Sequence, residues 1–219
     1  SSIDQRNWEG GYPGADVPVT FATGGAQATL AEDLQVKSVT FTLPASTAEF
    51  AIEAGDDSSD AKLRVSGNVV MTDSDETHTG VISVPTVVET ESVQFSVGAN
   101  DTLVLNGPVV PGASKLAFSK TGSGTLYLNA TNANYTSGSA AFSAGISYVK
   151  GGSLGGTAES PLAVDVTVPN VQSSFYLNGG VFNQRIAFLS AANGVSVCSS
   201  EGVTNVVNGR VELMNSSIM

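Results

Sequence analysis

The chain has very few of the side chains on which most catalytic and metal sites depend. Its 219 residues include one cysteine, Cys198, and one histidine, His78. A single cysteine excludes an intrachain disulfide, and the apolar run around Cys198 favours a packed thiol over a nucleophile. His78 lies in the acidic, turn-rich segment 72–80, which we expect to be an exposed loop. These two residues supply neither the ligands of a zinc site nor a nucleophile with its base, so we predict no catalytic and no cofactor-binding residues.

Positive charge is also scarce. Nine lysines and arginines stand against 20 acidic residues, which gives a net charge of −11. Binding to nucleic acid or to an anionic membrane needs a basic face, so neither is an expected partner. No apolar run approaches the roughly 18 residues of a membrane span, and the chain does not begin with the basic and apolar regions of a signal peptide. Both a mature secreted protein and an excised fragment fit these observations.

Short alternating apolar runs recur along the whole chain. Examples are VKSVTF at 36–41, VQFSV at 93–97, LAF at 116–118 and RIAFL at 185–189, and tight-turn residues such as Gly-Gly and Asn-Gly lie between the runs. Alternation with a period of two indicates strands with one buried side, and no helical periodicity competes with it. The pattern predicts an all-β fold, either a β-solenoid or a β-sandwich.

A repeat decides between these two architectures. TLVLN at 102–106 returns 23 residues later as TLYLN at 125–129, and Val93 and Phe95 return at the same offset as Leu116 and Phe118. A fixed period of 20 to 50 residues is typical of stacked coils. We therefore predict a parallel β-solenoid with coils of roughly 23 residues.

The repeat also predicts which residues stack on one another: Leu103 on Leu126, Leu105 on Leu128, and Asn106 on Asn129. A looser echo supports the period, because FAIEAG at 50–55 followed by KLRVSG at 62–67 resembles FSVGAN at 95–100 followed by TLVLNG at 102–107. The offset of the first pair is 45 residues, close to two repeat units. The prediction is one solenoid domain over 1–219, with an N-terminal cap within 1–22 that includes Trp8, and with the clearest repeats over 92–156.

The segment 120–145 reads KTGSGTLYLNATNANYTSGSAAFSAG. It follows the pattern Lys-x-Gly-x-Gly-Thr-Leu-x-Leu-x-Gly, then Asn-x-Tyr-x-Gly, then a closing Ala-Gly before an apolar strand, at the positions Lys120, Gly122, Gly124, Thr125, Leu126, Leu128, Tyr135, Gly138, Ala144 and Gly145. With this pattern the segment resembles the autotransporter-associated β-strand repeat. Ala130 stands where the family has glycine. The resemblance implies a right-handed parallel β-helix, secreted or on a bacterial cell surface after export, with no catalytic residues to carry over.

Carboxylates are the remaining candidates for a site. Two acidic segments offer hard oxygen ligands for calcium, the one cofactor that the sequence leaves open. The candidate ligands are Asp56, Asp57, Asp60, Asp73 and Asp75. Neither segment has the spacing of an EF-hand, and solvated turns are the competing interpretation.

A sugar-cleaving site would need two carboxylates within about 5–10 Å of each other. Such a site commonly also has aromatic rings that stack on the sugar. Tyr127, Tyr148, Phe175 and Tyr176 are candidates for that role, and positions in the core or in a stacked ladder are the alternative.

From these features we expect a non-enzymatic structural or adhesive protein of the cell surface or the extracellular space. The alternative is a carbohydrate-active β-helix, a polysaccharide lyase or a glycosidase. The strand-like run RVEL at 210–213 precedes a short apolar tail, which favours end-to-end self-association into a filament or continuation by further coils. Glycans or a host or cell surface are the other expected partners.

Overall fold

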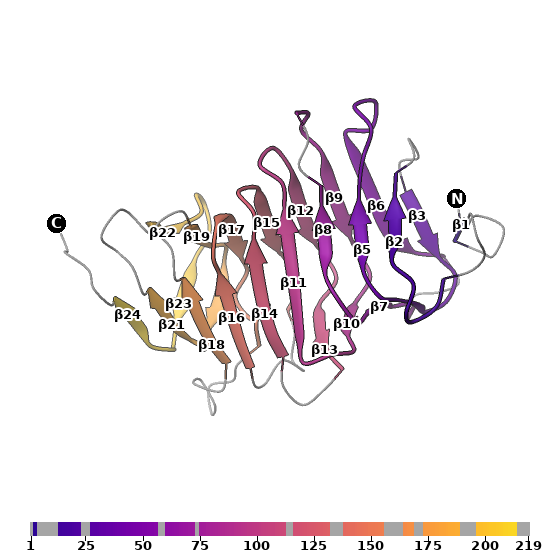
Figure 1. The fold of residues 1–219 in the computed structure, drawn as a ribbon. Helices are drawn as coiled ribbons and strands as arrows, with labels where there is room; N and C mark the ends of the chain where they lie inside the picture. Colours follow the sequence, from indigo (N-terminus) through magenta and orange to yellow (C-terminus); the bar gives the residue numbers. More distant parts are fainter. Residues whose placement is uncertain are drawn as a thin grey trace.

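The protein is a rod of stacked coils, with its two termini at opposite ends (Figure 1). The computed structural model describes residues 2–3, 13–22, 27–56, 60–72, 75–112, 116–131, 138–155, 164–168, 173–188 and 196–213. All regular structure in these residues is β-strand, and they contain no helix. The predicted cap residue Trp8 lies outside the described residues.

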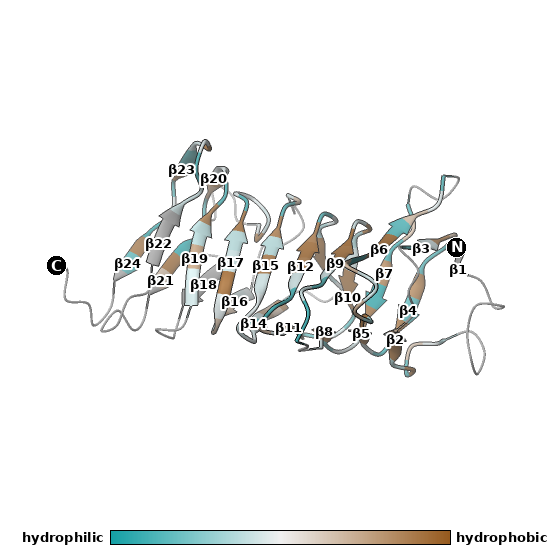
Figure 2. Ribbon diagram, turned by 90° about the horizontal axis from the view of Figure 1, so that it is seen from above, coloured by the Kyte–Doolittle hydropathy of each residue, from teal (hydrophilic) through white to brown (hydrophobic). Residues whose placement is uncertain are grey.

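Two long sheets form most of the rod, and they run side by side along its axis (Figures 1 and 2). Sheet A has nine strands, in the order β1 (Ser2–Ile3), β3 (Gln27–Leu30), β6 (Glu49–Ala54), β9 (Thr79–Ile82), β12 (Thr102–Leu105), β15 (Thr125–Leu128), β17 (Gly145–Val149), β19 (Ser173–Leu177) and β22 (Ser196–Ser199). Sheet B also has nine, in the order β2 (Val19–Phe21), β5 (Val39–Phe41), β8 (Val69–Met71), β11 (Ser92–Val97), β14 (Leu116–Thr121), β16 (Gly138–Phe142), β18 (Val164–Val168), β21 (Arg185–Phe188) and β24 (Val211–Leu213).

Two shorter sheets form a third side. Sheet C contains β13 (Val109–Pro111), β10 (Thr86–Val88), β7 (Leu63–Val65) and β4 (Leu34–Val36). Sheet D contains β20 (Gly180–Phe182) and β23 (Asn205–Val207). A turn in the N-terminal part therefore passes through sheets A, C and B before it returns to A, with about 24 residues per turn.

Every pair of adjacent strands in the described residues is parallel. A β-sandwich of hairpins and Greek keys is built from antiparallel pairs, so the sandwich alternative is wrong. The predicted parallel β-solenoid is confirmed.

The stacking predicted from the 23-residue repeat is confirmed in sheet A. Leu103 pairs with Leu126 and Leu105 with Leu128 in the register of β12 and β15. All four side chains are buried. Alternation places the other two residues of each strand on the outer face, so the same four-residue pattern recurs with the leucines inward.

In sheet B the same offset is wrong. Val93 of β11 pairs with Phe118, and Phe95 pairs with Lys120, so this register exceeds the predicted one by two residues. A shift of two keeps every side chain on its original face. The apolar pattern alone therefore does not distinguish the two registers.

The looser 45-residue echo is also wrong. Phe50 lies in β6 of sheet A whereas Phe95 lies in β11 of sheet B. The two segments share an alternating pattern because both are half-buried strands, and they do not occupy equivalent places in their coils.

Phenylalanines fill the core between the sheets. Ring centroids of Phe95 and Phe118 lie 4.9 Å apart, those of Phe118 and Phe142 5.7 Å apart, and those of Phe142 and Phe175 4.9 Å apart. All four side chains are buried, and burying each one contributes about 1.5–3 kcal/mol. Figure 2 shows brown apolar positions recurring from strand to strand along the rod.

Candidate functional site

The only histidine is buried, which contradicts the expected exposed loop. His78 is 3% exposed, and its Nδ1 lies 3.3 Å from Oδ1 of Asp101, which is also buried. The backbone N–H of His78 donates to the same carboxylate oxygen at 3.2 Å. The acidic composition of 72–80 suggested a solvated turn, but its last residues turn into β9 at a corner where the side chain points inward.

This corner belongs to the stacking of successive coils. The backbone N–H of Thr102 donates to the carbonyl of His78 at 2.8 Å, and the N–H of Thr125 donates to the carbonyl of Asp101 at 2.9 Å. His78 and Asp101 thus occupy equivalent corners one coil apart. Their burial keeps this pair away from any substrate in solution.

Lys120 is the second buried polar group, and the sequence reasoning did not single it out as a functional residue. Its ammonium donates three hydrogen bonds of 2.6 Å, to the carbonyl oxygens of Gly122, Gly124 and Ala144. Three N–H donors thus meet three acceptors, one of them on the following coil. Burial lowers the pKa of Lys120 to about 8, while the carbonyl bonds favour the protonated form.

The glycines around this ammonium leave it the space it needs. Gly145 has a φ of +69°, and a Cβ there would lie 2.4 Å from Nζ of Lys120. A Cβ at Gly124 would lie 1.9 Å from the carbonyl oxygen of Gly98. Five of the ten residues that carry the resemblance in 120–145 therefore meet around one charged group, which we call the lysine cage: Lys120, Gly122, Gly124, Ala144 and Gly145.

Three tyrosines form a ladder on the outer face of sheet A. The rings of Tyr127 and Tyr148 lie 4.5 Å apart and 7° from parallel, and those of Tyr148 and Tyr176 lie 4.6 Å apart at 21°. Partial burial raises the pKa of Tyr127, and the charge interaction and the hydrogen bond with Tyr148 raise it further. Each ring covers a face of its neighbour, so the ladder presents mainly ring edges and hydroxyl groups.

The fourth aromatic candidate for sugar stacking is placed elsewhere. Phe175 immediately precedes Tyr176 on β19, so it points to the opposite face, into the core, where it is buried. The four candidate aromatics therefore do not form one exposed platform.

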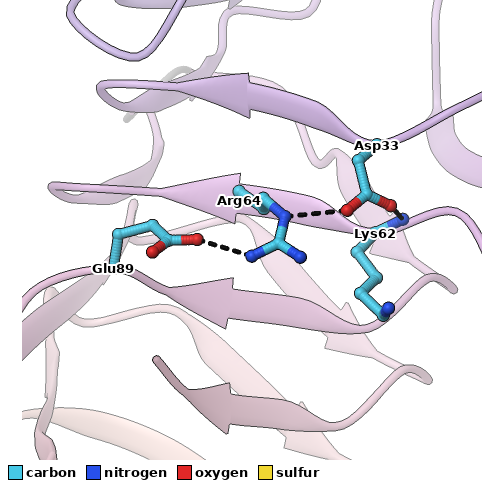
Figure 3. A network of polar contacts seen from close by, with 4 residues as sticks. All are labelled: Asp33, Lys62, Arg64 and Glu89. Carbon is cyan, nitrogen blue, oxygen red and sulfur yellow. Dashed lines mark hydrogen bonds and ion pairs between the residues drawn. The ribbon is translucent and has the colours of Figure 1, made fainter. Parts of the chain in front are cut away.

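Charged side chains meet on the outer face of sheet C (Figure 3). Nε of Arg64 donates to Oδ2 of Asp33 at 2.7 Å, and its Nη1 donates to Oε1 of Glu89, also at 2.7 Å. The backbone N–H of Lys62 donates to Oδ1 of Asp33 at 3.0 Å. One arginine on β7 thus ties together residues from three successive coils.

This cluster has two carboxylates but the wrong electrostatics for a general acid. Desolvation opposes the ionisation of Asp33, yet the hydrogen bonds from Arg64 and from the Lys62 backbone outweigh it and lower the pKa of Asp33. A sugar-cleaving general acid needs a raised pKa, so that it is still protonated at the working pH. Arg64 pairs with both Asp33 and Glu89, so the cluster links three successive coils through one arginine.

The calcium candidates lie at two different corners of the coil. Asp56 and Asp60 are exposed and lie between β6 and β7, whereas Asp75 is exposed and lies between β8 and β9. Asp57 and Asp73 lie outside the described residues. Within the part of the chain that the structure describes, no three His, Cys, Asp or Glu side chains come together as a group that could hold a metal ion.

Comparison of the chain with protein-family models, with curated proteins and with solved structures finds no match. Across the residues that the structure places, no helix is long and apolar enough to cross a membrane.

Proposed function

We propose that the protein is a non-enzymatic solenoid that acts as a structural or adhesive element outside the cell or on the bacterial cell surface. The observation that carries this proposal is that buried polar side chains form hydrogen bonds between successive coils. Lys120 bonds three carbonyls of two coils, and His78 and Asp101 join two more coils. The side chains best suited to acid–base chemistry, Lys120, His78 and Asp101, are thus used to join coils.

The outer face of sheet A supports an adhesive role. Eight of its nine strands contain no charged residue, although the chain carries a net charge of −11; the exception is β6, with Glu49 and Glu53. Such a face avoids the repulsion that an acidic protein meets at an acidic surface. Its hydroxyl groups and tyrosine edges offer hydrogen bonds to a neutral glycan or to another neutral surface.

Export is the second part of the proposal. It rests on the resemblance of 120–145 to the autotransporter-associated repeat, now joined by the lysine cage that its matching residues build. Antibody labelling of intact source cells tests this part. We expect labelling without permeabilisation, and labelling that needs permeabilised cells would contradict export.

The carbohydrate-active alternative predicts turnover, and a direct assay separates the two functions. We expect the purified chain to cleave no neutral or acidic polysaccharide. Bonds from arginines outweigh desolvation and lower the pKa of Asp33 and of Glu212, so both carboxyls stay ionised and neither suits a general acid. The assay measures new reducing ends and unsaturated products. Turnover that disappears in Asp33→Asn or Glu89→Gln would establish the enzymatic alternative instead.

Self-association through the ends of the rod completes the proposal. Among the described strands, β22, β24 and β23 are the last of sheets A, B and D, and each has one described strand neighbour. Such edges offer unpaired backbone groups to another chain.

A further inference from the structure

The outward side chains of sheet A change in size along the rod. Figure 2 shows the strands of this sheet side by side, from β3 to β22. The strand registers define a central outward row that runs from Ala51 through Val81 and Val104 to Tyr127 and the rest of the tyrosine ladder. Small side chains thus occupy the N-terminal part of this row, and tyrosines occupy its C-terminal part.

Charge changes along the same face. Glu49 and Glu53 are the only charged residues in the strands of sheet A, and both lie on β6. Lys150 directly follows β17, is exposed, and continues the backbone pairing of β15 with β17 by one residue. Glu53 lies two residues beyond Ala51, and Lys150 lies two residues beyond Tyr148, so alternation places both in the next outward row. This face therefore carries acidic groups at β6 and a basic group beside β17.

The gradients of size and charge complement each other when the face is turned against a copy of itself. In sheet A, β6 and β17 each lie two strands from β12, and β9 and β15 each lie one strand from it. A two-fold axis along β12, between two facing sheets, sets β6 of each copy opposite β17 of the other. Glu53 then faces Lys150, and Ala51 faces Tyr148. The small residues of the central row thus meet the tyrosines.

We infer that two copies of the chain pair face to face through sheet A, with their rods antiparallel and with the two-fold axis along β12. The inference rests on the adhesive role that the proposed function gives to this face, and it names a second copy of the chain as the partner. Facing sheets lie about 10 Å apart with their side chains interdigitated. Small residues opposite tyrosines fill that space evenly, and the contact gains two pairs of Glu53 with Lys150.

The charge of the whole rod favours antiparallel over parallel pairing. Residues 1–101 contain 16 acidic and four basic residues, which gives −12, whereas residues 102–219 contain four acidic and five basic residues, which gives +1. Antiparallel rods set each acidic half beside a nearly neutral one. A two-fold axis along the rod would instead place β6 on β6, so that Glu49 and Glu53 of both copies meet, and would place tyrosines on tyrosines.

The size of the face is adequate for a specific contact. With β12 on the axis, the seven strands from β3 to β19 of each copy overlap. At about 4.8 Å between strands and about 6.6 Å between outward rows, three rows on these strands cover on the order of 650 Å². The relief of the side chains raises the accessible area toward the roughly 800 Å² that each partner buries in a stable interface.

Charge reversal tests the inference on the 219-residue chain, with sedimentation velocity over a range of concentrations as the measurement. We expect the unchanged chain to associate, and Lys150→Glu and, separately, Glu53→Lys to raise the dissociation constant about 10-fold, because each substitution sets like charges against each other twice in a two-fold contact. Lys37→Glu and Glu91→Lys are the matched controls, since both residues are exposed and lie outside sheet A. Both controls should associate like the unchanged chain, and circular dichroism checks that each variant folds.

A mixture of the two variants tests the geometry itself. An equimolar mixture of Lys150→Glu with Glu53→Lys should associate as tightly as the unchanged chain, because both contacts of the mixed pair then join a glutamate to a lysine. A mixture no tighter than either variant alone, an equal weakening by the two controls, or a monomer at millimolar concentration would overturn the inference. A monomer that still labels intact cells and cleaves no glycan would overturn the pairing alone and leave the proposed function standing.

Discussion

The side-chain amide of Asn129 donates a 3.0 Å hydrogen bond to the side-chain oxygen of Asn106, 23 residues earlier. The two residues follow β15 and β12, so the bond runs along the rod between equivalent corners of successive coils. Closer to the C-terminus, the side-chain amide of Asn208 donates in the same way to the side-chain oxygen of Asn183 at 3.2 Å. Stacked amides thus satisfy one another along the axis, as ladders of identical side chains do in cross-β structures.

The direction of this bond makes an asymmetric prediction. Asn129→Asp removes the donor and places a carboxylate against the oxygen of Asn106, so we expect a loss of about 1 kcal/mol in the free energy of unfolding at pH 7. Asn106→Asp keeps an acceptor and gives it charge, so its stability should be unchanged or higher. Urea titration at pH 7 measures both variants. Equal losses in the two would mean that the bond does not stabilise the coil.

The inward row of leucines makes a second prediction. Leu126→Asp should prevent folding, because an unpaired buried carboxylate costs several kcal/mol. Thr125→Asp is the control, since Thr125 points outward on the same strand and should change stability by less than about 1 kcal/mol. Circular dichroism and thermal unfolding compare the two. A soluble Leu126→Asp chain with an unchanged midpoint would contradict the register of β12 and β15.

Nearly identical sequences made the pairing of β12 with β15 in sheet A predictable. TLVLN and TLYLN have the same inward leucines and the same corner asparagine, so one offset aligns every position of the two strands. Sheet B lacks such identity, and parity alone allowed the wrong pairing of Val93 with Leu116 in place of Phe118. Alternation determines which face is buried, and the number of residues in each corner determines the register.

Two buried polar residues show where local patterns help and where they do not. Lys120 follows Leu116 and Phe118 at alternate positions, so its burial could have been read from the period of two. The burial of His78 had no such signal, because its corner is defined by Asp101 on the next coil. The ion pairs of Arg64 likewise join residues that only the stacking brings together.

The third prediction concerns Gly145 of the lysine cage. Gly145→Ala should cost at least about 3 kcal/mol, because a Cβ there meets Nζ of Lys120 and two carbonyl oxygens in addition to the strain of a positive φ. Gly202→Ala is matched for strain, with a φ of +74° and no atom within 4 Å of its Cβ, and should cost only about 1 kcal/mol. Chemical denaturation measures the two costs. Similar values would mean that the cage tolerates the extra carbon.

The last prediction concerns the proton on Lys120. Burial lowers its pKa to about 8 in the folded protein from the ordinary value of 10.5. Between these two values the unfolded chain binds more protons than the folded one, so the free energy of unfolding should rise with pH across this window. The Lys120→Met variant lacks the ammonium but keeps every other titrating group. The difference in the free energy of unfolding between the unchanged protein and this variant therefore reports the titration of Lys120 alone.

At pH 7 the unchanged protein should be the more stable of the two, because methionine leaves the carbonyls of Gly122, Gly124 and Ala144 without their donor, at about 1–3 kcal/mol for each group that water does not reach. From pH 8 to 10.5 its advantage should grow by up to about 3 kcal/mol, the free energy of a shift of this size. Urea unfolding at half-unit intervals of pH measures the difference. A stability difference that stays constant from pH 8 to 10.5 would mean that the three carbonyl bonds fully offset the desolvation of the ammonium. A difference that shrinks would mean that these bonds raise the pKa of Lys120 above its ordinary value.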